Sequence, residues 1–252
     1  PMDQIVVHGT DTDVSPYDSG SYASSTTYLT GMAVVRACED MKKKIISKGA
    51  EYLGCEEENV DFDGQKVYQL NGKGEISLSD IGNRVMCNNE DMLSAGATHS
   101  SPVSPPPFMV GMAEVEVDKE TGQVELVDYV AVVDCGTPIN PNLARVQTEG
   151  GIAQGIGMAL YEDITYDSKG KLAENSFMQY TIPTRLDVGK IRVEFESSYE
   201  PTGPFGAKSI GEIVINTPSP AIAHAVDNAV GVRIRELPIT AEKVYFGVIE
   251  QE

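Results

Sequence analysis

The loop Pro204–Ile213 carries the residue best suited to chemistry, a carboxylate with apolar neighbours. Glu212 is flanked by Ile210 and Ile213, and such surroundings desolvate a carboxylate and strengthen it as a general base. Gly211 directly before it lets the backbone approach a ligand closely. From these residues alone, a loop glutamate that caps the following helix remains the alternative.

The glycine spacing of this loop matches a phosphate-binding P-loop, but the residues that follow do not. Four residues separate Gly206 from Gly211, and that motif then requires Lys followed by Ser or Thr. Glu212 and Ile213 occupy those positions, and a carboxylate there would repel a phosphate group. We therefore exclude nucleotide binding by this loop.

A second segment with functional side chains runs from Thr10 to Thr27 and consists almost wholly of Ser, Thr, Asp, Gly, Pro and Tyr. It leads directly into Tyr28–Ser47, where apolar residues recur at helical spacing. A hydroxyl-rich loop that opens a helix presents hydroxyls beside unpaired N–H groups, an arrangement that binds anions. N-capping of the helix by Ser25 or Thr26 is the structural alternative, and both roles are compatible.

A glycine-rich helix is expected from Leu143 to Leu160, after Asn140-Pro141. Its four glycines each weaken a helix by about 1 kcal/mol relative to alanine, so they indicate close approach by another group. Tight packing on a sheet and close approach of a ligand explain these glycines equally well. Gln154 is the lone long polar side chain among them and can both donate and accept hydrogen bonds.

The other elements intermix without regular βαβ alternation, which predicts an α+β fold. The expected strands and hairpins are Ile5–His8, Val60–Tyr68 around Asp63-Gly64, Val115–Asp118 with Gln123–Asp134, Glu162–Asp167 and Ile191–Phe195. The expected further helices are a short one beginning near Ser79, which follows a strand at Ile76, then Ser219–Val230 and Thr240–Ile249.

Composition limits the classes of partner and the organisation. The 252 residues, 41% of them hydrophobic, suffice for one large domain or two small ones. A net charge of -19 argues against nucleic acid or an anionic membrane surface as the main partner, whereas a small anionic substrate stays possible. Four scattered cysteines without a CxxC pair predict no zinc or iron–sulfur site, and they favour reduced thiols in a cytoplasmic protein.

Four segments in sequence order resemble the molybdenum hydroxylases, the family of xanthine dehydrogenase and aldehyde oxidase. Gly206–Glu212, with the sequence Gly-Ala-Lys-Ser-Ile-Gly-Glu, resembles the motif that carries the catalytic glutamate of that family. Thr12–Gly31 is similar to the loop that holds the molybdopterin cofactor. Asp134–Pro141 resembles the strand end before the family's glycine-rich helix, and Glu149–Gly157 resembles that helix. The likeness covers most of the chain.

The resemblance implies a mechanism and a set of cofactor contacts. Glu212 is implied to take the proton from a molybdenum-bound hydroxyl, which then attacks an electron-poor carbon of an N-heterocycle or an aldehyde. The pterin dithiolene is implied to hold the molybdenum, so no protein metal ligand is expected. The implied cofactor contacts are Ser21, Ser24, Ser25, Thr26, Gln154 and Gly211. We expect Lys208 to hold the loop by its charge rather than to take part in chemistry.

The resembled subunits are about three times longer than this chain, which corresponds only to their C-terminal portion. We expect residues 1–252 to form the C-terminal part of a molybdopterin-binding region, with mixed sheets packed against helices and two α+β subdomains interleaved in sequence. A split subunit, as in nicotinate dehydrogenase, or a fragment of a longer one would explain the abrupt start.

The partners implied by the resemblance are the remaining molybdopterin-binding chain or domain, an iron–sulfur subunit and an FAD subunit that together carry electrons away. The alternative is a non-catalytic structural or assembly subunit of the same fold. Glu212 and Gln154 favour the enzyme, because a scaffold needs neither residue.

Overall fold

The computed structural model describes residues 1–9, 11–13, 15–18 and 20–251, and the chain in it divides into two compact units. The first unit comprises Pro1–Gly20 and Leu29–Ser101, and the second comprises Ser21–Tyr28 and Pro102–Glu252. Three members of the predicted hydroxyl-rich loop and the last residue of the chain lie outside the described residues: Thr10, Val14, Ser19 and Glu252.

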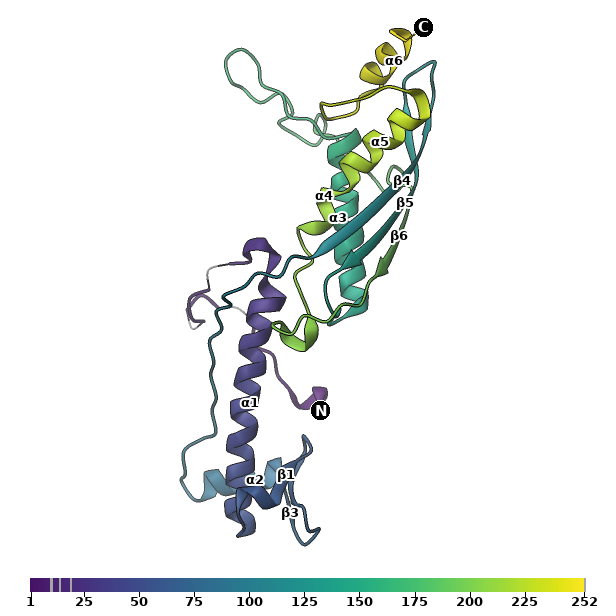
Figure 1. Cartoon of the computed structure of the whole chain (residues 1–252). Coiled ribbons are helices and arrows are strands. Elements are labelled where there is room, and N and C mark those ends of the chain that lie inside the picture. Colours follow the sequence, from purple (N-terminus) through teal and green to yellow (C-terminus); the bar gives the residue numbers. More distant parts are fainter. Residues whose placement is uncertain (10, 14, 19, 252) are drawn as a thin grey trace. The chain divides into compact units, whose positions relative to one another are not determined.

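The first unit combines all but the first three residues of the long helix α1 (Thr26–Leu53) with a small antiparallel sheet near the C-terminal end of that helix (Figure 1). The sheet has the order β1-β2-β3, with β1 (Val60–Phe62), β2 (Lys66–Gln69) and β3 (Glu75–Ser77). Helix α2 (Leu78–Cys87) follows β3 at once, and the Ser77 Oγ caps it by accepting the Asp80 N–H at 3.0 Å. The predicted hairpin around Asp63-Gly64 is confirmed.

The strand predicted at Ile5–His8 is wrong. These residues form no strand, and Val6 is 94% exposed. A short β-branched run needs a neighbouring strand to pair with, and no described segment pairs with this one. Only a 3₁₀ turn, η1 (Met2–Gln4), precedes it.

The second unit contains a three-stranded sheet with the order β4-β5-β6. Its strands are β4 (Phe108–Val117), β5 (Val124–Asp134) and β6 (Lys190–Phe195). The predicted hairpin is confirmed as the antiparallel pair β4 and β5, and β4 begins earlier than Val115, where the sequence predicts it. The third strand, β6, pairs in parallel with β5, so that β5 is central.

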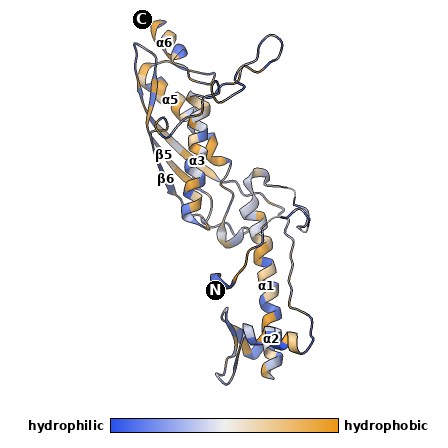
Figure 2. Ribbon diagram, turned by 180° about the vertical axis from the view of Figure 1, so that it is seen from behind, coloured by the Kyte–Doolittle hydropathy of each residue, from blue (hydrophilic) through white to orange (hydrophobic). Residues whose placement is uncertain are grey.

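Helices α3 (Pro141–Leu160) and α5 (Pro218–Val230) cover one face of this sheet (Figure 1). Both carry apolar stretches (Figure 2), and their buried residues join those of the central strand in one core, represented by Tyr129, Ile156 and Ile222. The short helix α4 (Ile213–Asn216) and the C-terminal α6 (Ala241–Ile249) complete the unit. Among the described residues, no helix has the length and apolar character needed to cross a bilayer.

The strand predicted at Glu162–Asp167 is also wrong. Between α3 and β6 the chain makes an extended loop (Figure 1), in which a single bridge joins Tyr166 to Leu172. The Glu174 carboxylate accepts hydrogen bonds from the N–H and the hydroxyl of Thr165, so local turn contacts take the place of a sheet. As at the N-terminus, the β-branched pattern lacks a partner strand.

The glycines of α3 serve packing at two positions. A Cβ on Gly151 would collide with the Val214 side chain, whose Cβ would be 3.0 Å away, and a Cβ on Gly155 would lie 2.7 Å from the Pro218 Cγ. These glycines therefore let α4 and α5 approach α3 closely. At Gly150, by contrast, no atom lies within 4 Å of an added Cβ, so packing does not explain this glycine.

Alanine substitutions at these adjacent glycines are expected to have opposite effects on stability. Gly151→Ala should destabilise the chain by about 1–3 kcal/mol, because the added methyl overpacks the contact with Val214. Gly150→Ala should stabilise α3 by up to about 1 kcal/mol, because glycine is a poor helix former and the site is open. Urea midpoints of the two variants measure the difference, and equal midpoints would contradict the packing of α3 on α4.

Candidate functional site

The loop that carries Glu212 is fastened to the end of the central strand β5. The Thr137 N–H donates to the Gly206 carbonyl at 2.8 Å, and the Lys208 N–H donates to the Cys135 carbonyl at 2.8 Å. A Cβ on Gly136 would collide with the Gly206 carbonyl oxygen, and Gly136 also has a φ of +68°, so this close contact requires glycine. Two of the four segments picked out in the sequence therefore lie side by side.

An ion pair reinforces this attachment. The Lys208 Nζ lies 2.7 Å from the Asp134 Oδ2, and both side chains are largely buried, at 11% and 18% exposure. The second carboxylate oxygen of Asp134 accepts the Ser198 hydroxyl at 2.5 Å and the Gly136 N–H at 2.9 Å. The ammonium of Lys208 also lies 5.7 Å from the centre of the Phe108 ring. The loop-holding role predicted for Lys208 is thus confirmed.

Burial by itself would raise the pKa of Asp134, but the hydrogen bonds from Lys208, Ser198 and the Gly136 amide outweigh it. The pKa of this carboxyl therefore lies below its ordinary value. A carboxyl whose pKa is lowered by folding contributes stability above the unfolded pKa, and that contribution is lost as the pH falls through the folded pKa.

We therefore expect a pH-dependent stability difference between wild type and Asp134→Asn. At neutral pH the variant should be less stable by about 2 kcal/mol, the usual worth of hydrogen bonds to a charged group. The difference should stay constant down to about pH 4, the unfolded carboxyl range, and shrink below it. Urea midpoints at pH 7, 5 and 3 measure it, and a difference that grows toward pH 3 would refute this account.

The hydroxyl-rich loop contacts the Glu212 loop where Ser24 lies against Gly211. Ser24, in the 3₁₀ turn η2 (Tyr22–Ser24), has a left-handed backbone with a φ of 53°. A Cβ placed on Gly211 would lie 2.6 Å from the Ser24 Oγ and 2.9 Å from the Ser24 Cβ. Only glycine fits against Ser24 without displacing it, so the backbone before Glu212 touches the loop that the sequence predicts to bind a cofactor.

The other hydroxyls of this loop surround the start of α1. Ser21 precedes η2 and is exposed, and the Ser25 hydroxyl donates to the Tyr22 carbonyl at 2.7 Å. Thr26 is the first residue of α1. The N-terminus of a helix presents backbone N–H groups without intrahelical acceptors, so hydroxyls and N–H groups gather here as an anion site requires.

A glutamine that the sequence reasoning missed lies at the same place. The Gln147 Nε2 would be 3.9 Å from a Cβ on Gly211, beside the Ser24 contact. Gln154, predicted as the cofactor contact, is exposed and lies seven residues later, about 10 Å farther along the axis of α3. The two glutamines lie on one face of α3, with Gly150 between them. Their spacing of seven residues places both on the same helix face, and this spacing could have pointed to Gln147 from the sequence.

A hollow of about 330 Å³ opens beside these residues. It is lined by the end of β5, the first turns of α3 and the Glu212 loop, and its polar lining includes Thr27, Asn140, Gln147 and Lys208. Cys135 lies in its wall, where burial raises the pKa of the thiol. Segments that are far apart in the sequence of the second unit therefore line one hollow.

Glu212 itself is exposed, which corrects the expected apolar environment. Ile210 and Ile213 pack against the core of the second unit, so their side chains turn inward and leave the carboxylate on the surface. Glu212 precedes α4 but makes no side-chain cap hydrogen bond, which leaves the helix-capping alternative without support. No other part of the described chain shields this carboxylate from water.

Residues 1–189 match the family model described as a molybdopterin cofactor-binding domain. The chain belongs to this family. It is 36% identical over 246 residues to the probable hypoxanthine oxidase XdhD of Escherichia coli K12, with 97% of this chain and 26% of the relative covered. It is 32% identical over 248 residues to the putative xanthine dehydrogenase molybdenum-binding subunit XdhA of the same organism, with 96% and 33% covered.

The fold of this molybdopterin-binding chain is also that of solved molybdenum enzymes. Reconstituted CO dehydrogenase from Oligotropha carboxidovorans superposes with a TM-score of 0.87 at 25% identity, over 99% of this chain and 32% of that chain. The resemblance to molybdenum hydroxylases and the α+β fold are therefore confirmed. The chain spans only 26% and 33% of the lengths of the two relatives XdhD and XdhA.

The residues of the site fit a molybdopterin. Gly211 lies close against Ser24, and hydroxyls, the N–H groups at the start of α1 and the Gln147 amide lie near this contact as polar partners for a pterin and its phosphate. A pterin supplies its own sulfur ligands to the metal, so a set of protein ligands is not required. In the described part of the chain, no group of three or more His, Cys, Asp or Glu side chains is placed to hold a metal ion.

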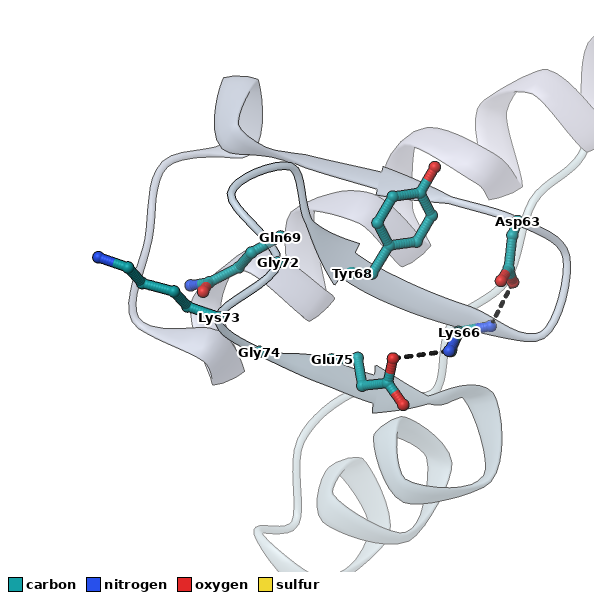
Figure 3. Close-up of a pocket in the computed structure, with 8 residues that line it drawn as sticks. All are labelled: Asp63, Lys66, Tyr68, Gln69, Gly72, Lys73, Gly74 and Glu75. Atoms are coloured by element: carbon teal, nitrogen blue, oxygen red, sulfur yellow. Dashed lines mark hydrogen bonds and ion pairs between the residues drawn. The ribbon is translucent and has the colours of Figure 1, made fainter.

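The first unit has a hollow of its own, about 550 Å³ in volume, on its small sheet (Figure 3). Three of the charged residues that line it bind one another: the Lys66 Nζ lies 2.6 Å from the Glu75 Oε2, and the Lys66 backbone N–H donates to the Asp63 Oδ1 at 2.9 Å (Figure 3). Lys73, the fourth, is turned away from them (Figure 3), so the charged side chains do not converge here, and the candidate site is the one in the second unit.

Proposed function

We propose that this molybdopterin-binding chain forms part of a hydroxylase or dehydrogenase in which Glu212 accepts a proton as the general base. The contact of Gly211 with Ser24 is the observation that carries the proposal. It joins the predicted cofactor loop to the backbone of the predicted base, so a cofactor held by that loop lies beside Glu212. A carboxylate at such a place can take a proton on Oε in the reacting complex.

In this proposal the hydroxyl-rich loop holds the cofactor. Ser21, Ser24, Ser25 and Thr26 bind it through hydroxyls and the N–H groups at the start of α1, and Gln147 offers its amide from α3. Gln154 binds farther along the same helix face, and Gly211 lets the Glu212 loop approach Ser24 closely. When bound, the molybdopterin supplies a molybdenum centre that accepts the substrate's electrons.

The remainder of the molybdopterin-binding region is proposed to cover Glu212. The carboxylate is exposed in this chain, and a general base gains strength when water is excluded from it. The same assembly would include an iron–sulfur and an FAD chain or domain that take up the electrons. Because the relatives carry the names hypoxanthine oxidase and xanthine dehydrogenase subunit, we favour a purine-like N-heterocycle over an aldehyde as substrate.

The test is the molybdenum and pterin content of the protein purified from its native source, with every co-purifying chain identified. Mass spectrometry of the metal and the fluorescence of the oxidised pterin measure the content. We expect both in the assembly, together with the rest of the molybdopterin-binding region and an iron–sulfur chain. A complete assembly that contains neither molybdenum nor pterin would instead support a structural or assembly subunit.

A further inference from the structure

The Asp134 carboxylate adds a side-chain connection to the backbone hydrogen bonds that join the Glu212 loop to the end of β5. Asp134 is the last residue of β5, the central strand. It accepts hydrogen bonds from Lys208 in the loop, from Ser198 in the segment after β6, and from the Gly136 N–H in the turn after β5. Lys208 lies over the ring of Phe108, the first residue of β4. This ion pair therefore ties the loop to the end of β5, to the start of β4 and to the segment after β6.

The loop has further contacts on either side of Lys208. Gly206 and Lys208 make backbone hydrogen bonds to the β5 end, Ile210 packs against the core of the second unit, and Gly211 then lies against Ser24. The position of Gly211 against Ser24 therefore depends on where Lys208 and Ile210 are held. A shift of the loop at Lys208 would move Glu212 relative to the cofactor loop.

We infer that Asp134, acting through Lys208, is a positioning residue that sets the place of Glu212 beside the cofactor loop. The inference rests on the proposed function of Glu212, which it deepens. Neither Asp134 nor Lys208 touches a reacting group. Their ion pair holds the backbone from which the base projects, and misplacement of a catalytic group by about 1 Å can cost about 10²-fold in rate.

The test uses the full native assembly and compares Lys208→Gln, Lys208→Arg, Asp134→Asn and the double variant Asp134→Asn with Lys208→Gln. Arg192→Gln is the matched control, because it breaks another ion pair of the same sheet, in which the Arg192 Nη2 lies 2.8 Å from the Asp128 Oδ2. The first readout is amide hydrogen exchange of residues 204–213. The second is the anaerobic rate of cofactor reduction by hypoxanthine, with dithionite as a reductant that needs no base.

We expect Lys208→Gln and Asp134→Asn to speed exchange at residues 204–213, while Arg192→Gln leaves it as in wild type. Both variants should lower the rate of reduction by hypoxanthine about 10- to 100-fold, with the substrate Kd, molybdenum content and reduction by dithionite unchanged. Lys208→Arg should restore part of the rate, because arginine can still pair with Asp134. The double variant should be no slower than either single one.

Unchanged exchange at residues 204–213 in Lys208→Gln would overturn the inference, whatever the substrate of the assembly. So would an equal loss of rate in Arg192→Gln, which would show a general loss of stability. If Glu212→Gln keeps the wild-type rate, the proposed function fails. If Glu212→Gln is inactive and Lys208→Gln is unaffected, only the positioning role fails.

Discussion

Glu212→Gln is expected to lower the rate of substrate oxidation by about 10²- to 10⁴-fold, the usual contribution of a general base. Glutamine has the same size as glutamate but does not accept a proton at neutral pH. Because Glu212 is exposed and makes no cap hydrogen bond, the substitution removes no packing contact of the core and leaves folding intact. Anaerobic single-turnover reduction of the assembly, with molybdenum and pterin content measured on the same samples, checks this prediction.

A matched control is available on the same unit. Glu194 is exposed on β6, and Glu194→Gln makes the same change of charge away from the loop. We expect it to keep the wild-type rate. Wild-type activity of Glu212→Gln in a molybdenum-loaded assembly would contradict the base assignment and would make Glu212 an ordinary surface carboxylate of the family fold.

Elements encoded by local patterns were predictable from the sequence. The hairpin of β4 and β5 follows from alternating side chains and a Gly122 turn, and α3 follows from Asn140-Pro141, where the Asn140 side chain caps the helix. The two failures, Ile5–His8 and Glu162–Asp167, have strand-like composition but no partner strand. Pairing depends on residues far along the chain, and composition does not reveal it.

Candidate residues for the site could be proposed from the sequence, but their arrangement could not. The motif of Glu212 could be read directly, whereas its exposure depends on Ile210 and Ile213 turning into the core, which requires the fold. The contact of Gly211 with Ser24 joins segments that are distant in the sequence. Gln147, and not Gln154, lies beside this contact, and the sequence does not distinguish the two glutamines in this respect. The sequence suggests which side chains to consider, and the tertiary structure shows which of them meet.

Gly211→Ala is expected to remove most of the bound cofactor. The new Cβ would lie 2.6 Å from the Ser24 Oγ and 2.9 Å from the Ser24 Cβ, so the cofactor loop has to move. Overpacking of this kind costs about 1–3 kcal/mol. If that cost falls on the cofactor-bound state, affinity for the cofactor falls by about 5- to 150-fold. Molybdenum and pterin content of the purified assembly measure the loss.

Gly82→Ala is the control for the same chemical change. Gly82 lies in α2 of the first unit, and no atom lies within 4 Å of an added Cβ there, so this variant should keep full cofactor content. The cause of a loss in Gly211→Ala is then local to the contact with Ser24, because the core of the second unit is untouched. Full cofactor content in Gly211→Ala would mean that the contact of these two loops does not set the cofactor site, and the proposed binding site would have to be abandoned.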